Sequence, residues 1–115
     1  SVVVKSAAKR SKDKIYIIQQ IDKKVSLDEI IKAKKVTMAE LTQDIEQICF
    51  SGTKLNISYY IDQILDPEKQ EEIYDYFMSS ESDDILTAIQ ELDDESLTEE
   101  ELRLMRIKFI SEMGN

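Results

Sequence analysis

Apolar residues recur at spacings of three and four along most of the chain, which predicts a succession of amphipathic helices. The first stripe consists of Ile15, Ile18 and Ile21, with Ile17 beside it, and predicts a helix that Asp13 caps. Comparable stripes predict further helices between Ser26 and Lys35, between Thr37 and Gly52, and over about 57–65, 67–78, 85–92 and 98–113.

Capping signals mark where several of these helices begin. Ser26, Thr37 and Thr98 are each followed three residues later by Glu, the pattern of a capping box, in which hydroxyl and carboxylate satisfy each other's backbone N–H groups. The pair Asp66-Pro67 predicts another start, because Pro at the first helical position gives up no hydrogen bond. Gly52 suits the left-handed position that ends a helix.

The segment 26–52 has the spacing of a helix-turn-helix, two short helices joined by a tight turn that Val36 fills. Its second helix is a poor candidate for reading base edges. On the helical pattern we expect it to expose Glu40, Asp44 and Glu46, while only Gln43 and Gln47 can donate hydrogen bonds to bases.

The composition favours an all-α fold. With 115 residues, 42% of them apolar, the chain is long enough for one core, and two Gly and one Pro leave little material for β-turns. We therefore predict a compact all-α bundle of about six or seven helices that contains the helix-turn-helix. The stretch 50–58 leaves room for a small β-wing after the third helix.

Charge is distributed unevenly. Up to Lys35 the chain has ten Lys and Arg against four acids, a net of +6, and from Val36 onward it has five against twenty, a net of −15. We divide the chain into a basic linker over 1–12 and a helical domain over 13–115. Because the chain begins at Ser1 without Met, we interpret it as a domain of a longer protein.

Several kinds of chemistry are excluded or disfavoured by the residues present. With no His and one Cys, neither the usual Cys/His zinc site nor a Ser-His-Asp or Cys-His relay can be assembled. We predict no catalytic and no metal-binding residue. Helix capping accounts for the acids near helix starts, and packing is favoured for Cys49 and for the tyrosines at helical spacing.

Contact with DNA, if made, is predicted to use lysines that attract phosphate without reading sequence. The basic run before the body is equally well interpreted as a solvated linker. The candidate DNA-binding residues are Lys5, Lys9, Arg10, Lys12, Lys14, Lys32, Lys34, Lys35, Gln43 and Gln47.

Three stretches resemble a known family. Lys54 to Tyr60, Glu72 to Phe77 and above all Glu101 to Met113 are similar to the C-terminal end of ATP-dependent DNA helicases of the RecQ family from Bacteroides-like bacteria. The resemblance covers nearly everything from Asp13 to Asn115. It implies a helix-turn-helix domain appended beyond the helicase core, and none of the family's catalytic or zinc-binding residues has a counterpart here. Lys34 and Lys35 depart from a typical turn, where an apolar residue and a Gly are common.

The resemblance implies a non-catalytic accessory domain that positions DNA or a partner protein for an ATPase elsewhere in the parent. ATP, Mg²⁺ and Zn²⁺ are then cofactors of that parent helicase, which unwinds DNA in the 3'-5' direction in repair and recombination, and the domain itself needs none. The expected partners are DNA, bound weakly and without sequence specificity, or a basic protein. A free-standing transcription regulator is a further alternative. We expect a monomer without membrane contact, in the bacterial cytoplasm near the nucleoid.

Overall fold

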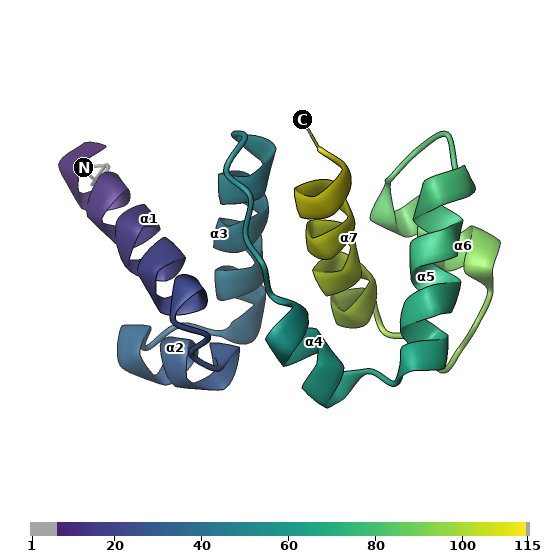
Figure 1. Ribbon diagram of the computed structural model, residues 1–115, viewed down its shortest axis with the longest axis horizontal. Helices are drawn as coiled ribbons and strands as arrows, with labels where there is room; N and C mark the ends of the chain where they lie inside the picture. Colours follow the sequence, from purple (N-terminus) through teal and green to yellow (C-terminus); the bar gives the residue numbers. More distant parts are fainter. Residues whose placement is uncertain (1–6, 115) are drawn as a thin grey trace, which may run out of the picture.

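Seven helices and no strand make up residues 7–114, the part of the chain that the computed structural model describes (Figure 1). This confirms the all-α class and the helix-turn-helix, which is formed by α2 and α3. The β-wing for which 50–58 left room does not form, because 53–57 runs between α3 and α4 without pairing to a strand. The helices are α1 (Ala7–Asp22), α2 (Leu27–Lys34), α3 (Met38–Phe50), α4 (Ser58–Ile64), α5 (Pro67–Ser79), α6 (Ile85–Leu92) and α7 (Glu99–Met113).

The helices form two groups that meet in the middle of an elongated molecule, 42 × 29 × 28 Å along its principal axes. In Figure 1, α1, α2 and α3 occupy one end, α5 and α6 occupy the other, and α4 connects them. Helix α7 lies beside α3 at the centre and packs against α3, α4, α5 and α6. The last helix in the sequence is therefore the central one in space.

This central position changes which α7 side chains are buried. Leu102 and Met105 are buried as their spacing predicts, but Leu104 and Ile107 are equally buried, each 1% exposed. A helix with neighbours on several sides buries more than one stripe, so the single apolar face expected for α7 was too narrow. Met113 is 51% exposed because it lies in the last turn.

Helix α1 begins earlier than predicted. It starts at Ala7 rather than Asp13, so Asp13 lies within the helix and cannot cap it, and residues 7–12 of the predicted basic linker are helical. Ala, Lys and Arg are strong helix formers, which explains the extension. Residues 1–6 of the expected linker lie outside the described part. On the apolar stripe, Ile17 and Ile21 are buried whereas Ile15 is 52% exposed.

Two of the three predicted capping boxes are confirmed, those of Thr37 with Glu40 and of Thr98 with Glu101. The third is wrong. The Ser26 hydroxyl accepts from the N–H of Asp28, while the N–H of Glu29 bonds to the Ser26 carbonyl. Asp66 caps α5 ahead of Pro67, and Gly52 adopts a positive φ of 107° after α3, both as expected.

Candidate nucleic-acid interface

The turn between α2 and α3 is tight and presents lysines. Lys35 ends α2 in the left-handed conformation, with φ 59° and ψ 46°, and its N–H donates to the carbonyl of Ile31. The next residue, Val36, donates to the same carbonyl at 3.1 Å. A left-handed position favours Gly, which has no Cβ, so Lys35 is more strained here than a Gly would be. The turn therefore forms without the usual Gly and keeps the Lys35 side chain exposed.

The start of α3 carries a negative charge where a base-reading helix would enter the major groove. The N–H of Glu40 donates to Thr37 Oγ1 at 3.1 Å, and the Thr37 N–H donates to Glu40 Oε1 at 2.9 Å. Gln43 and Gln47 are exposed further along, followed by Phe50, whose side chain is 57% exposed. The outward stripe of α3 thus offers two amides and no cation.

Glu46 is buried, contrary to the expectation that α3 exposes it. It is 6% exposed and faces α7, where two guanidinium groups surround its carboxylate. Arg103 donates from Nε to Oε2 at 3.1 Å and from Nη2 to Oε1 at 2.5 Å, and Arg106 donates from Nη2 to Oε2 at 2.8 Å. We call these three residues the Glu46 clamp. It fixes the back of α3 to the central helix.

The clamp keeps the carboxylate charged although it is out of solvent. Burial by itself would raise the pKa of Glu46, but the hydrogen bonds and positive charges of Arg103 and Arg106 outweigh it and lower the pKa. Two cations around one anion leave a surplus of positive charge. Arg106 directs Nη1 to the Asp83 carbonyl at 3.1 Å, and its guanidinium carbon lies 5.3 Å from the centre of the Phe50 ring.

The sequence contained a signal for this arrangement. Thr42, Glu46 and Cys49 are spaced four and three apart, beside the stripe of buried isoleucines, so helical geometry alone places Glu46 near the inner face. Its identity as an acid led to the prediction of an exposed position. Only the packing of α7 on α3 supplies the two cations that make the burial tolerable.

An ion pair and a ring contact join the end of α2 to α1. Lys34 Nζ, at the end of α2, is 3.5 Å from Asp13 Oδ1 on α1 and 5.7 Å from the centre of the Tyr16 ring. Lys12 precedes Tyr16 by one helical turn and is exposed. The α2–α3 turn is therefore placed against the part of α1 that carries the N-terminal lysines.

The ten predicted DNA-binding residues differ in availability. Lys12, Lys32, Lys35, Gln43 and Gln47 are exposed. Lys34 is engaged by Asp13 and Tyr16, with 14% of its side chain exposed, and Lys14 is directed to Ser51 Oγ at 3.5 Å. Lys5 lies outside the described residues, and the side chains of Lys9 and Arg10 do as well. The availability of these side chains does not test whether they bind DNA, which stays a prediction.

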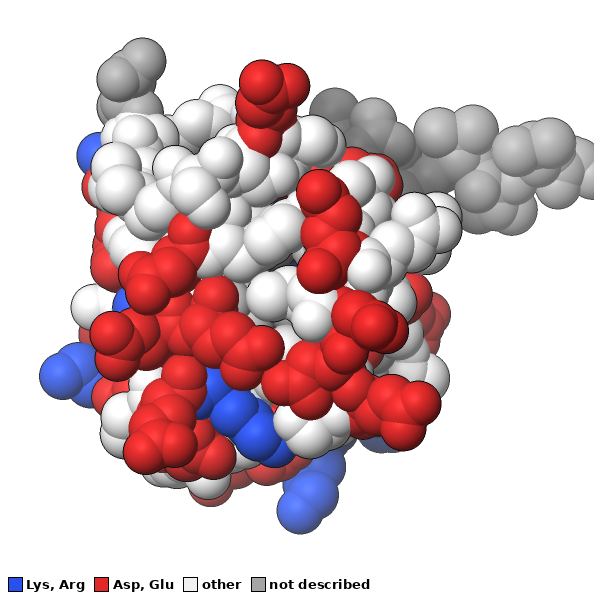
Figure 2. All heavy atoms as spheres, turned by 90° about the vertical axis from the view of Figure 1, so that its right-hand side faces the viewer, with Lys and Arg blue, Asp and Glu red and all other residues white. Residues whose placement is uncertain are grey.

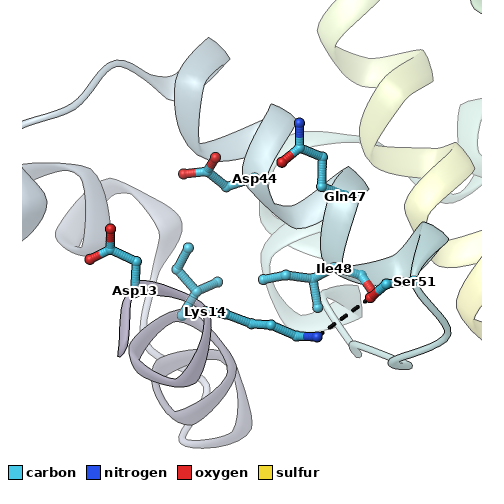
Figure 3. A pocket seen from close by; sticks show the side chains of 7 residues that line it. Asp13, Lys14, Asp44, Gln47, Ile48 and Ser51 are labelled. Atoms are coloured by element: carbon cyan, nitrogen blue, oxygen red, sulfur yellow. Dashed lines mark hydrogen bonds between the residues drawn. The ribbon is translucent and has the colours of Figure 1, made fainter. Parts of the chain in front are cut away.

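A groove lies between α1 and α3, lined by Asp13, Lys14, Ile17, Asp44, Gln47, Ile48 and Ser51. Figure 3 shows the Lys14 side chain running along it toward Ser51, with the carboxylates of Asp13 and Asp44 on its other side. Its two carboxylates are set against the ammonium groups of Lys14 and of Lys34, which pairs with Asp13, so the groove has no surplus of positive charge to attract phosphate. The groove is lined in part by Gln47 of α3, and it is not a phosphate-binding site.

The remaining candidates have structural roles. Cys49 is buried, and burial raises the pKa of its thiol despite the contact with Ser111 Oγ at 3.5 Å, as expected for a packed cysteine. Tyr60 is buried, and the Tyr74 ring packs against Phe109, with centroids 5.7 Å apart. Asp84 caps α6 by accepting from the N–H of Thr87. These contacts confirm packing and capping.

Within residues 7–114 there is no helix long and apolar enough to cross a membrane. The described residues also contain no group of three or more Cys, Asp or Glu arranged to hold a metal ion.

Comparison with known proteins supports the resemblance found in the sequence. Residues 11–61 match the family model of the RecQ-1-like helix-turn-helix domain. No curated protein matches the chain. The matched segment contains α1 from Ser11 onward, α2, α3 and the first half of α4, so it includes the α2–α3 turn, whereas α7 and its two arginines lie beyond it. The Bacteroides-like source of the resemblance stays a prediction. A little under half of the chain, residues 11–61, is thus similar to the helix-turn-helix domain of RecQ-1-like proteins.

Proposed function

We propose that this chain is a non-catalytic accessory domain of a RecQ-type ATP-dependent DNA helicase, and that its helix-turn-helix half contacts the DNA backbone weakly. One observation carries the proposal. The ion pair between Lys34 and Asp13 holds the end of α2 against α1, so the exposed Lys12, Lys32 and Lys35 all belong to the group of helices at one end of the molecule. Lysines gathered in this way can follow a row of phosphates.

The charge balance favours the same end. Residues 11–61 carry eight Lys and Arg against seven acids, a net of +1, whereas 62–115 carry four against seventeen, a net of −13. Residues 62–115 repel a polyanion such as DNA, whereas residues 11–61 do not. Lys5, Lys9 and Arg10 add three further cations ahead of the matched segment. The domain would therefore meet DNA with α1 and α2 toward it and α5 and α6 away from it.

Base reading by α3 is disfavoured. The carboxylate of Glu40 sits at the N-terminal tip of α3, and the Gln43 and Gln47 side chains share their stripe with no cation. The specific contacts made most often in a major groove come from Arg and Lys, which the stripe lacks. We therefore propose contact that is indifferent to sequence and strongly dependent on salt.

The test is an anisotropy titration of labelled duplex DNA over a series of salt concentrations. Each phosphate contact contributes about −0.9 to the log–log slope, so replacing Lys32 and Lys35 by Ala should flatten it by about two units. Replacing Lys34 should change the slope less than replacing Lys35, because Lys34 is already paired with Asp13. The control is the Lys69→Ala, Lys108→Ala pair, on α5 and α7 in the acidic half.

The glutamines decide between backbone contact and base reading. Replacing Gln43 and Gln47 by Ala should leave the affinity nearly unchanged. If the glutamine pair proves essential and the lysine pair dispensable, α3 reads bases and backbone contact is the wrong proposal.

The domain should hydrolyse no nucleotide, with or without DNA. ATP, Mg²⁺ and Zn²⁺ belong to the parent helicase, which we place in the bacterial cytoplasm with the nucleoid, and we propose that the domain is monomeric.

A second candidate function is the docking of a basic protein. Figure 2 shows the end of the molecule formed by α5 and α6, where acidic side chains cover much of the surface and few basic ones lie among them. The sequence has no Lys or Arg between Lys69 and Arg103. Absence of DNA binding even at low salt would favour this candidate over the first.

A further inference from the structure

Helix α6 presents apolar side chains to solvent. Leu86 is 65% exposed and Ile89 is 40% exposed, and because they are three residues apart they lie on the same face of the helix. Of the eight residues of α6, Ala88 alone is fully buried. Ile85 and Leu92, at the edges of the outward face, are half-buried against the core. More than half of the apolar side chains of α6 are therefore only partly covered by the domain.

Carboxylates lie at both ends of this helix. Asp83 precedes α6 and Asp93 ends it, whereas Glu91, two residues after Ile89, is turned toward α5, where it accepts from the Tyr76 hydroxyl at 2.6 Å. From α7, Arg106 reaches the same region, but its guanidinium is engaged by Glu46 and by the Asp83 carbonyl. An apolar face in the acidic half of the chain, with an acid at each end of its helix, is thus left without a partner within residues 7–114.

The negative charge around α6 indicates which kind of partner fits this face. A second copy packed through the same face would set like charges against each other, because residues 62–115 carry a net of −13, and DNA would be repelled in the same way. A partner helix with leucine-like side chains on one face and Lys or Arg beside them would cover Leu86 and Ile89 and place its cations by the carboxylates. This is the arrangement of an amphipathic helix recognised by its apolar anchors.

We propose that the outward face of α6, built on Leu86 and Ile89 and flanked at the helix ends by Asp83 and Asp93, docks a basic amphipathic helix of a partner protein. The proposal deepens the docking function suggested above and does not depend on DNA contact by α1 and α2. In this proposal the apolar contacts provide most of the affinity, and the charges determine which partner binds.

The probe is a synthetic peptide of leucine and lysine, with the leucines spaced to fall on one face of a helix, titrated by anisotropy. A scrambled peptide of the same composition measures attraction by charge alone. Replacing Leu86 and Ile89 by Ser should weaken binding of the first peptide by at least about tenfold, which is about 1.4 kcal/mol. Ile15→Ser is the matched control, because Ile15 is 52% exposed on α1.

The proposal requires that the amphipathic peptide bind more tightly than the scrambled one, and that Asp93→Asn weaken binding more at low salt than at high salt. Equal binding of both peptides would overturn it, as would equal effects of the Ile15 and the Leu86/Ile89 variants, or no binding at all. Both variants change exposed side chains, and circular dichroism checks that the helices are intact. The DNA proposal fails or holds separately, since it rests on the response to the Lys32/Lys35 variant.

Discussion

Glu46 of α3 and Arg103 of α7 form two parallel hydrogen bonds across the interface between the helix-turn-helix half and the C-terminal half, although 57 residues separate them in the chain. Arg106 completes the clamp from the next turn of α7. The segment that matches the family model therefore depends on a helix outside that segment for the position of α3.

Replacing Arg103 by Met should lower the free energy of unfolding by about 3 kcal/mol, because it leaves the buried carboxylate with one cation in place of two. Urea denaturation followed by circular dichroism measures the loss. Lys32→Met, which changes an exposed cation on α2, should shift stability by less than about 0.5 kcal/mol. Equal effects of the two substitutions would mean that the clamp contributes nothing to stability.

The clamp also predicts a pH dependence. The pKa of Glu46 is lower in the folded state than in the unfolded chain, so its contribution to stability is complete above the unfolded value of about 4.3 and is lost as the pH falls through the folded value. We expect the difference in unfolding free energy between the wild type and Glu46→Gln to shrink as the pH falls below about 4. A difference that stays constant down to acid unfolding would contradict the assignment.

Replacing Lys35 by Gly should affect stability and DNA binding in opposite directions. Gly relieves the left-handed backbone at φ 59° and should raise the free energy of unfolding by about 0.5–1 kcal/mol, while removal of the ammonium weakens DNA binding. Lys24→Gly is the matched control, since Lys24 has φ 61° in the turn before α2. It should stabilise the domain to a similar extent and leave the affinity for DNA nearly unchanged. The same loss of affinity in both variants would point to net charge rather than to the α2–α3 turn.

The capping residues should differ in their energetic weight. Thr98→Ala should cost about 1 kcal/mol, because Thr98 and Glu101 satisfy two backbone N–H groups at 3.1 and 2.8 Å. Ser26→Ala should cost less. The Ser26 hydroxyl accepts only from the N–H of Asp28, at 3.2 Å, and no side-chain carboxylate accepts from the N–H of Ser26 as in a capping box. Thermal denaturation of the two variants compares them directly. A larger loss at Ser26 would show that hydrogen bonding at the cap does not decide the order.

The sequence by itself determined the helices and most of their ends. Spacing of apolar residues and the capping groups at Thr37, Asp66 and Thr98 depend on interactions within one or two turns, which a linear pattern contains. The same local information placed the left-handed Gly52 and the packed Cys49. The start of α1 was predicted too late, because Ala, Lys and Arg extend a helix without adding to an apolar stripe.

Only the tertiary structure decided which faces of those helices are covered. The pattern of α3 places Glu46 near its inner side, but burial of a carboxylate is stable only with cations nearby, and these come from α7 at the other end of the chain. In the same way, α6 reads as a helix with a core face, yet Leu86 remains 65% exposed because α5 and α7 cover its other side. Helical period sets the direction of a side chain relative to its own axis, whereas burial and pairing depend on the neighbours that long-range packing brings there.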